Sequence, residues 1–337
     1  GKDAASPRYI FTNLSPMARL LFPEVDDPLL TRLEDDGVAI EPIFFCPILP
    51  LLLLNGSQGI GTGWSTSIPS HSAEDVWEYV RAKLDEEENN NKKRNLPSIQ
   101  PWVKGFTGRI VRKEDDSGYR SIGKVKKLSK SSILISELPV GRWTNDYKDH
   151  LIKMQSKGEI QSFVENHTTS TVSFTVKMKP LQLNRMHKSG LEKVFKLESN
   201  LPITNMHAFD QENNIIRYDS PESIADAHFT TRLGLYHHRK RALERAKDYS
   251  ATMMRNKARF IEEVIMGDID FVRGKKSKLD TVHQLKELDF QTIRDLDMIL
   301  SENDDTSQIE VSDVAYDFDL KQFDYLLKLP LSSLTSD

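Results

Sequence analysis

The spacing of apolar and polar positions predicts short helices and strands near the start of the chain. Apolar residues from Leu14 to Leu21 recur at helical spacing, behind Ser15 and Pro16, which favour a helix start. Two aliphatic runs follow, Val38 to Phe45 and Ile48 to Leu54, each interrupted by prolines. We expect both runs to be extended and to lead into a glycine-rich loop.

The middle of the chain has a mixed pattern, with helical periodicity in some segments and β-rich runs in others. The polar run from Glu86 to Arg94 is of low complexity and is typical of a surface loop. We predict helices over Ala73 to Leu84 and near Asp146 to Met154, and strands over Gly108 to Val111, Ile133 to Ile135 and Thr171 to Val176.

The stretch from Ser220 to about Ile265 predicts one very long helix, because a Ser-Pro start is followed by no further proline. About 45 residues would form a rod of roughly 65 to 70 Å. We expect another helix to pack beside it, since its apolar positions are Ile224, Leu233, Leu243, Tyr249, Met253, Phe260 and Val264. Val282 to Leu300 and Phe323 to Leu327 also look helical, so the predicted fold class is α+β.

Composition limits the kinds of protein this can be. The chain has 337 residues, 38% of them hydrophobic, enough for two or three domains with cores. Its longest apolar run, Ile48 to Leu54, is far shorter than the roughly 20 residues that span a bilayer, so no membrane partner is expected. The single cysteine, Cys46, cannot form an internal disulfide, which fits a reducing compartment such as the cytosol or nucleus.

The charge is unevenly distributed along the chain. The net charge of -4 disfavours nucleic-acid binding if the charges are spread evenly. Two stretches are nevertheless basic, Arg120 to Lys130 and a run made of Arg232, His237, His238, Arg239, Lys240, Arg241, Arg245 and Lys247. Either run is compatible with a solvated face or with a surface for phosphates.

The segment around Arg8 and Tyr9 is the sharpest candidate for chemistry. A tyrosine hydroxyl has an ordinary pKa of about 10, so it needs a cation, a metal or a base to act as a nucleophile at neutral pH. A guanidinium such as that of Arg8 can hold two phosphate oxygens and stabilise the charge of an in-line displacement. The alternative is an ordinary dipeptide, with Tyr9 packed in a core and Arg8 on the surface.

The second candidate is the glycine-rich segment from Asn55 to Ser65. Its glycines would let the backbone approach a phosphate, but the spacing matches neither a dinucleotide loop nor a P-loop, and it contains no lysine. A structural turn and a backbone clamp on nucleic acid both remain open. Ile60 lies between glycines, as an apolar wedge between base pairs would.

The pair His237 and His238 does not predict a metal site. Adjacent residues on a helix point about 100° apart, and no cysteine or carboxylate completes a ligand set. A basic helix face is the better interpretation. We likewise find no serine, histidine and aspartate arrangement for nucleophilic catalysis.

Taken together, the motifs resemble the catalytic core of eukaryotic type IIA topoisomerases. Residues 5–12, Ala-Ser-Pro-Arg-Tyr-Ile-Phe-Thr, are similar to the active-site tyrosine motif, and Leu20 to Pro23 continue it. Residues 55–56 and 59–65 resemble the loop whose isoleucine inserts into DNA. Further similarity covers residues 135–140, 190–197 and 325–327, so the resemblance extends over nearly the whole chain.

The resemblance implies a division into three parts and a reaction. Residues 1–46 are expected to finish a winged-helix domain, 47–218 to form a mixed α/β tower, and 219–337 to form a truncated coiled-coil arm and helical C-gate. Tyr9 is expected to attack a DNA phosphodiester with help from Arg8. The expected DNA-binding residues are Lys2, Ser6, Asn55, Gly59, Ile60, Thr62, Gly63 and Ser65.

The resemblance also implies partners outside this chain. We expect the chain to be a piece of a longer nuclear protein, a homodimer that passes duplex DNA strands during chromosome segregation. Its Mg²⁺ and ATP are expected to bind domains absent here, so we predict no metal ligand among these residues. Two alternatives are kept: an inert DNA-bending and dimerisation fragment, and a nucleotide-binding enzyme that uses the glycine-rich loop.

Overall fold

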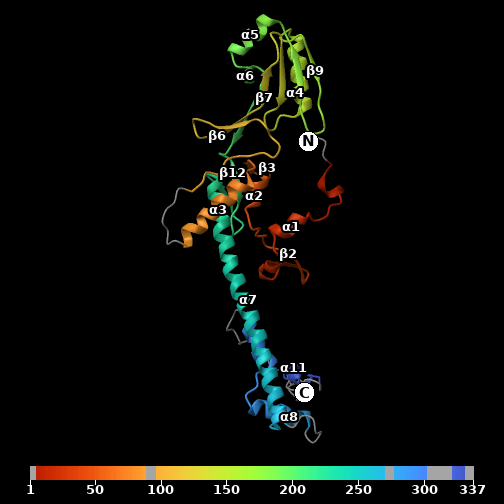
Figure 1. Cartoon of the computed structure of the whole chain (residues 1–337), viewed down its shortest axis with the longest axis vertical. Helices are drawn as coiled ribbons and strands as arrows, with labels where there is room; N and C mark the ends of the chain where they lie inside the picture. Colours follow the sequence, from red (N-terminus) through yellow and green to blue (C-terminus); the bar gives the residue numbers. More distant parts are fainter. Residues whose placement is uncertain (1–4, 89–95, 270–276, 302–320, 331–337) are drawn as a thin grey trace. The chain divides into compact units, whose positions relative to one another are not determined.

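The computed structural model divides into two compact units, Gly1–Leu233 and Gly234–Asp337 (Figure 1). It describes residues 5–88, 96–269, 277–301 and 321–330. Within these ranges, no helix combines the length and the apolar composition needed to cross a membrane.

The first unit begins with small elements that carry the Arg-Tyr segment. They are η1 (Pro7–Tyr9), α1 (Pro16–Leu21), η2 (Glu24–Leu29), β1 (Arg32–Asp35) and β2 (Val38–Pro42). The helix predicted after Ser15 is confirmed, and the Ser15 hydroxyl caps it by accepting from the Met17 amide at 3.1 Å. Strands β1 and β2 form an antiparallel hairpin, so the prediction of an extended run after Val38 is also confirmed.

A second group of elements surrounds the glycine-rich segment. It contains α2 (Leu51–Asn55), β3 (Ser57–Ile60), β4 (Ser65–Ile68), α3 (Ala73–Glu88), β12 (Met206–Phe209) and β13 (Ile215–Tyr218). Their shared core is formed by Leu53, Ile68, Val76, Tyr79, Ile99, Met206, Ile224 and Ala225.

Helix α3 confirms the helix predicted from Ala73 and extends it to Glu88. The prediction of a surface loop from Glu86 was therefore wrong for its first three residues, because the helix continues through the acidic run without a proline or glycine to end it. The rest of that polar run lies outside the described residues.

The prediction that Ile48 to Leu54 is extended throughout was wrong. The residues of α2 are four leucines and Asn55, and Leu53 is fully buried, so packing favours a helical turn directly after Pro50. Gly56, with φ of +68°, ends the helix and turns the chain into β3.

Two antiparallel sheets form the middle of the first unit. The three-stranded sheet has the order β11-β6-β5, from β5 (Arg109–Arg112), β6 (Gly118–Ile122) and β11 (Glu198–Pro202). The four-stranded sheet has the order β7-β8-β10-β9, from β7 (Lys124–Lys127), β8 (Ser132–Glu137), β9 (Ser162–Glu165) and β10 (Phe174–Lys177).

Helices α4 (Thr144–Ser156), α5 (Pro180–Lys188) and α6 (Leu191–Val194) pack with the four-stranded sheet. The core joins Tyr147 and Leu151 of α4 to Ile133 and Ile135 of β8 and to Phe174 of β10. The helix predicted near Asp146 and the strands predicted around Ile133, Gly108 and Val176 are therefore confirmed, and the class is mixed α+β as expected.

The predicted long helix is confirmed as α7 (Pro221–Met266), 46 residues in length. Its first turns belong to the first unit, where Ile224 and Ala225 are buried. The rest of α7, from Gly234, belongs to the second unit. In this part of the helix Phe260 is fully buried, whereas Leu243 is 48% exposed.

The second unit also contains α8 (Lys278–Glu287), α9 (Ile293–Leu300) and α11 (Asp324–Leu327). Its core is formed by Phe260, Ile269, Val282, Leu285, Phe290, Phe323 and Leu326. The prediction of a single helix over Val282 to Leu300 was wrong. Helix α8 ends at Glu287, and Asp289 follows with a left-handed φ of +55°. Thr292 then starts α9 with a capping box to Asp295.

Candidate DNA interface and cleavage site

Tyr9 lies in the short turn η1, with its side chain 76% exposed. Its backbone amide donates to the Ser6 carbonyl at 3.0 Å, which closes the turn. The Arg8 guanidinium carbon lies 5.6 Å from the centre of the Tyr9 ring, and Arg8 Nε donates to Ser6 Oγ at 3.4 Å. The alternative in which Tyr9 packs in a core is therefore wrong, and a polynucleotide can reach its hydroxyl beside a cation.

The glycine-rich segment forms a β-hairpin from β3 and β4. The register pairs Ile60 with Ser65 and Gly59 with Thr66, and the Gly61 amide donates to the Trp64 carbonyl at 2.8 Å. Ile60 is therefore carried next to the tip of the hairpin, where it is 92% exposed. At this exposure Ile60 gains almost nothing from the protein's own core, and its side chain is free to contact a partner.

The glycines of this segment have different structural roles. A Cβ on Gly56 would lie 2.7 Å from the Ile68 carbonyl oxygen, so the backbone needs glycine there. Gly59 has an ordinary φ and open space where a Cβ would be. Gly63 combines open space with φ of +76° in the tight turn. Glycine is thus required by the backbone at Gly56, whereas neither space nor φ requires it at Gly59.

Two residues that the sequence interpretation missed support this hairpin from the side. The Asn205 carbonyl accepts from the Ser67 amide at 2.7 Å, and Asn205 Nδ2 donates to Ser65 Oγ at 3.0 Å. The centre of the His207 ring lies 5.4 Å from that of Trp64. Nothing in the sequence signals these contacts, because the two segments are far apart in the chain.

The predicted site residues fall into two groups. Gly59, Ile60, Thr62, Gly63 and Ser65 lie together in the hairpin, with Asn55 at the end of α2 just before it. Ser6 lies with Arg8 and Tyr9, while Lys2 is outside the described residues. Among the described residues, the hydrogen bonds of Ser6, Arg8 and Tyr9 lie within that segment, and none joins it to the hairpin.

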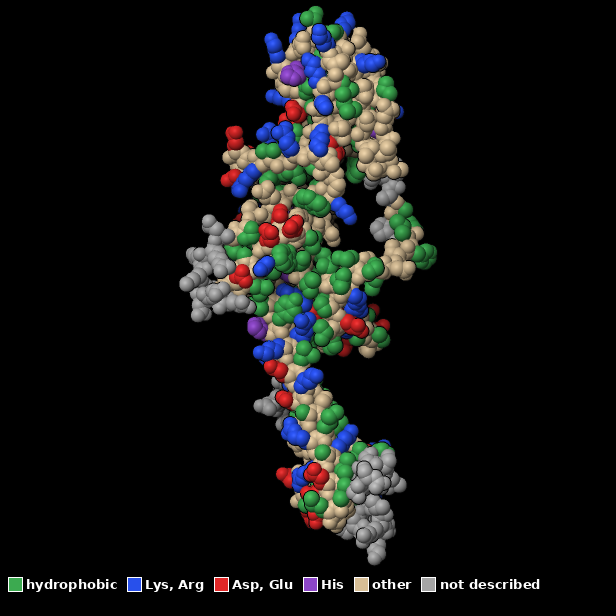
Figure 2. Space-filling view, in the orientation of Figure 1, with side chains coloured by type: hydrophobic (Ala, Val, Ile, Leu, Met, Phe, Trp, Pro, Cys, Tyr) green, Lys and Arg blue, Asp and Glu red, His purple; other side chains and the backbone are tan. Residues whose placement is uncertain are grey.

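The two basic stretches do not form continuous basic faces. Arg232 is only 4% exposed and pairs with Asp26, so including it in a solvated face was wrong. In the other stretch Arg120 pairs with Glu198 at 3.5 Å, while Lys124, Lys126, Lys127 and Lys130 are exposed. On the face drawn in Figure 2, Lys and Arg side chains gather over the part of the first unit that holds β6, β7 and α5.

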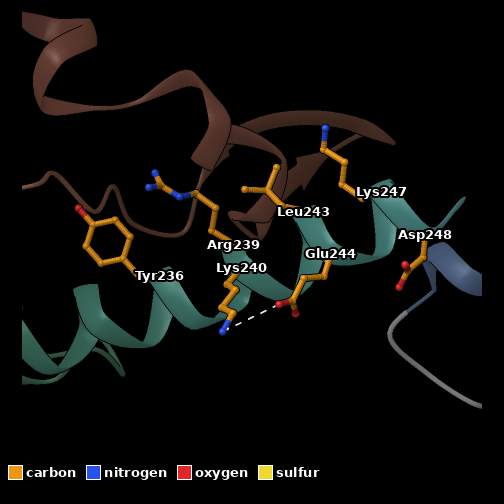
Figure 3. A pocket seen from close by; sticks show the side chains of 7 residues that line it. All are labelled: Tyr236, Arg239, Lys240, Leu243, Glu244, Lys247 and Asp248. Carbon is orange, nitrogen blue, oxygen red and sulfur yellow. Dashed lines mark ion pairs between the residues drawn. The ribbon is translucent and has the colours of Figure 1, made fainter. Parts of the chain in front are cut away.

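A hollow on α7 is lined by Tyr236, Arg239, Lys240, Leu243, Glu244, Lys247 and Asp248 (Figure 3). The Arg239 guanidinium lies 4.8 Å from the Tyr236 ring centre, and Lys240 pairs with Glu244 at 3.9 Å. The lining combines three cations with two carboxylates, so its net positive charge is small. Across the described residues, no three His, Cys, Asp or Glu side chains are grouped to hold a metal ion.

The fold is that of a topoisomerase II cleavage core. A solved structure, the Plasmodium falciparum topoisomerase II DNA-binding, cleavage and re-ligation domain, aligns with 99% of this chain and 45% of its own, with 33% identity and a TM-score of 0.77. This similarity confirms the fold class that the motifs predicted.

The chain belongs to the DNA gyrase/topoisomerase IV A-subunit family, whose profile matches residues 1–337. DNA topoisomerase 2 from Plasmodium falciparum (isolate K1 / Thailand) is 33% identical over 346 residues, which cover 99% of this chain and 24% of that protein. DNA topoisomerase 2-alpha from Gallus gallus is 37% identical over 357 residues, which cover 100% and 22%. The chain thus spans less than a quarter of these relatives, and the predicted resemblance to eukaryotic topoisomerase II is confirmed.

Proposed function

We propose that this chain is the breakage and reunion region of a topoisomerase II, with Tyr9 as its nucleophile. The observation that carries the proposal is the 76% exposure of Tyr9 beside Arg8. The phenolic oxygen bonds to a DNA phosphorus as the bond from phosphorus to the 3′ oxygen breaks. The phenolic proton leaves to a base or water, and the 3′ oxygen takes up a proton. The reverse step reseals the strand.

Arg8 would act on the phosphate and not on the leaving sugar. Its guanidinium is next to the nucleophile in the chain and carries a permanent charge, so it can bind the non-bridging oxygens during displacement. Ser6, which accepts from Arg8 Nε, orients that side chain before DNA arrives. These two residues therefore bind and orient the phosphate, while the covalent bond is made by Tyr9.

The β3–β4 hairpin would bend the DNA that Tyr9 cuts. Ile60 is an exposed aliphatic side chain near the hairpin tip, the form of side chain that wedges between base pairs. Asn55, Gly59, Thr62, Gly63 and Ser65 would contact the backbone of the nucleic acid around that wedge. Lys2 would add a phosphate contact near Tyr9.

The whole protein would supply further parts of the machinery. We propose a nuclear homodimer that passes one duplex through another in chromosome segregation and uses ATP and Mg²⁺. When bound, Mg²⁺ stabilises the attacking and leaving oxygens. Its ligands would come from domains outside this chain. Residues 1–46, 47–218 and 219–337 would be winged-helix, tower, and coiled-coil with C-gate segments.

The test is the removal of one oxygen atom in the complete protein. Tyr9→Phe should abolish covalent protein-DNA adducts trapped with denaturant, while duplex binding stays within about twofold because the cationic groups that bind phosphate remain. Tyr236→Phe is the matched control and should form adducts normally. Adducts that persist in Tyr9→Phe would overturn the assignment of Tyr9 as the nucleophile. If the unaltered protein bends DNA but forms no adducts, a DNA-bending fragment without cleavage becomes the better explanation.

A further inference from the structure

Asn205, which precedes β12, forms hydrogen bonds along the outer edge of β4. Three of its polar groups are used there. The Asn205 carbonyl accepts from the Ser67 amide at 2.7 Å, Nδ2 donates to Ser65 Oγ at 3.0 Å, and Oδ1 lies 2.8 Å from His207 Nδ1. Asn205 therefore contacts both a backbone group and a side chain of the strand opposite Ile60.

The hydrogens of this network are assigned from the orientation of the Asn205 amide. Because Asn205 Nδ2 donates to Ser65, Oδ1 faces His207 and must accept, so the His207 Nδ1 carries the proton. The His207 ring then packs against Trp64 at 5.4 Å between centroids. The amide of Asn205 thus also orients the ring that supports the end of the hairpin turn.

The hairpin needs such support because its own contacts are few. Two short strands alone are marginally stable in water, and Ile60 contributes no burial at 92% exposure. Gly59 and Gly61 add backbone freedom at positions with open space around them. Strand β4 is the better supported side of the hairpin, because Ile68 at its end is buried in the core and Asn205 bonds to Ser65 and Ser67 nearer the turn.

We infer that Asn205 is a positioning residue that holds the Ile60 hairpin ready to insert into DNA. This inference rests on the proposed function of Ile60 as a wedge. Insertion must offset the unstacking of a base step, and a hairpin that had to become ordered at the same moment would carry an additional entropic cost. Loss of the Asn205 amide should therefore weaken bending more than it weakens binding to phosphates.

The first experiment needs no DNA. Hydrogen exchange over residues 57–68 is compared in the complete protein and in its Asn205→Ala variant. Loss of the amide contacts should speed exchange there by about five- to tenfold, the effect of losing one or two net hydrogen bonds. Asn200→Ala, at an exposed position on β11, is the control and should change nothing. Unchanged protection in Asn205→Ala overturns the inference.

The second experiment measures bending of an end-labelled duplex by energy transfer. Asn205→Ala should lower the bent fraction of bound DNA by about threefold or more, with the salt dependence of binding unchanged because the phosphate contacts remain. In an Ile60→Ala background, Asn205→Ala should have no further effect, and an equal loss there overturns the inference.

The two experiments separate this inference from the proposed function. If the unaltered protein neither bends DNA nor forms adducts, the proposed function fails, whatever the exchange data show. If the unaltered protein bends DNA and Asn205→Ala bends it equally well, the wedge is retained and Asn205 is not its positioning residue.

Discussion

Arg232 Nη1 lies 2.8 Å from Asp26 Oδ2, and both side chains are almost completely buried, at 4% and 5% exposure. Arg232 also donates to the Cys46 carbonyl at 3.0 Å. The His228 ring, one turn earlier on α7, lies 2.8 Å from the Pro47 carbonyl. The start of α7 is thus fixed to the segments on both sides of β1 and β2, in the same part of the chain that carries Tyr9.

Removing one partner of this pair should be costly, because it leaves the other charge buried. We expect Arg232→Met to lower the free energy of unfolding by about 3 to 5 kcal/mol in urea titrations. The exposed pair of Arg19 and Asp27, at 3.0 Å, is the control, and Arg19→Met should cost under about 1 kcal/mol.

The paired variant gives the sharper comparison. Asp26→Leu combined with Arg232→Met removes both charges and should recover much of the loss seen in Arg232→Met. A single variant no less stable than the Arg19 control would show that this ion pair does not anchor α7.

Arg232 shows why charge runs are poorly interpreted from sequence. Successive helix residues point about 100° apart, so a basic run on α7 covers several faces, and only the partner decides which face is buried. That partner, Asp26, is near the beginning of the chain, far from Arg232 in the sequence, and no spacing rule connects the two residues. Local patterns are safer: α7 itself was predicted to within about one residue at each end, from a Ser-Pro start and the absence of proline.

Acid should weaken the core around α2 and the start of α7. Burial is the main cause that lowers the pKa of His71 and of His228 below the ordinary range of histidine. His71 Nδ1 contacts the Leu53 carbonyl at 3.2 Å, so the neutral ring is held in place. Both rings are therefore expected to be neutral when the protein is folded near pH 7.

The direction in which stability changes with pH follows from proton uptake by the folded and unfolded chains. The unfolded chain binds protons at about pH 6.5, the ordinary histidine pKa, while the folded chain does so only at lower pH. Stability from these residues is therefore complete above that pH and is lost as the pH falls towards the folded pKa, by at most about 1.4 kcal/mol per pH unit for each histidine.

The measurement compares urea unfolding at about pH 7.5 and about pH 5.5, on either side of the ordinary histidine pKa. His71→Gln should flatten the pH dependence, since an amide can still donate to the Leu53 carbonyl but does not titrate. His237→Gln, at an exposed position on α7, should leave the pH dependence as it was. Equal slopes for all three proteins would contradict the assignment of acid sensitivity to buried histidine.

The candidate site was predictable in part. Arg8, Tyr9 and Ile60 stand out in sequence because a cation beside a phenol and an aliphatic residue among glycines are local patterns, and the structure exposes both Tyr9 and Ile60. Asn205 could not be found that way, because its role depends on a contact between strands distant in the chain. The short helix α2 was missed for a similar reason, since burial of Leu53 outweighs its local pattern.

Gly56 and Gly59 should separate the structural part of the hairpin from the part that meets DNA. Gly56 has φ of +68° and a backbone oxygen 2.7 Å from where a Cβ would lie, so Gly56→Ala should lower the free energy of unfolding by about 1 to 3 kcal/mol. A Cβ added at Gly59 would have no atom within 4 Å, so Gly59→Ala should lower the free energy of unfolding by under about 1 kcal/mol. If the backbone at Gly59 approaches a phosphate, however, Gly59→Ala should weaken duplex binding several-fold in a filter or anisotropy assay. If the Gly59→Ala variant binds DNA normally, the glycine-rich segment is only a structural turn, and Ile60 is its single contact with the nucleic acid.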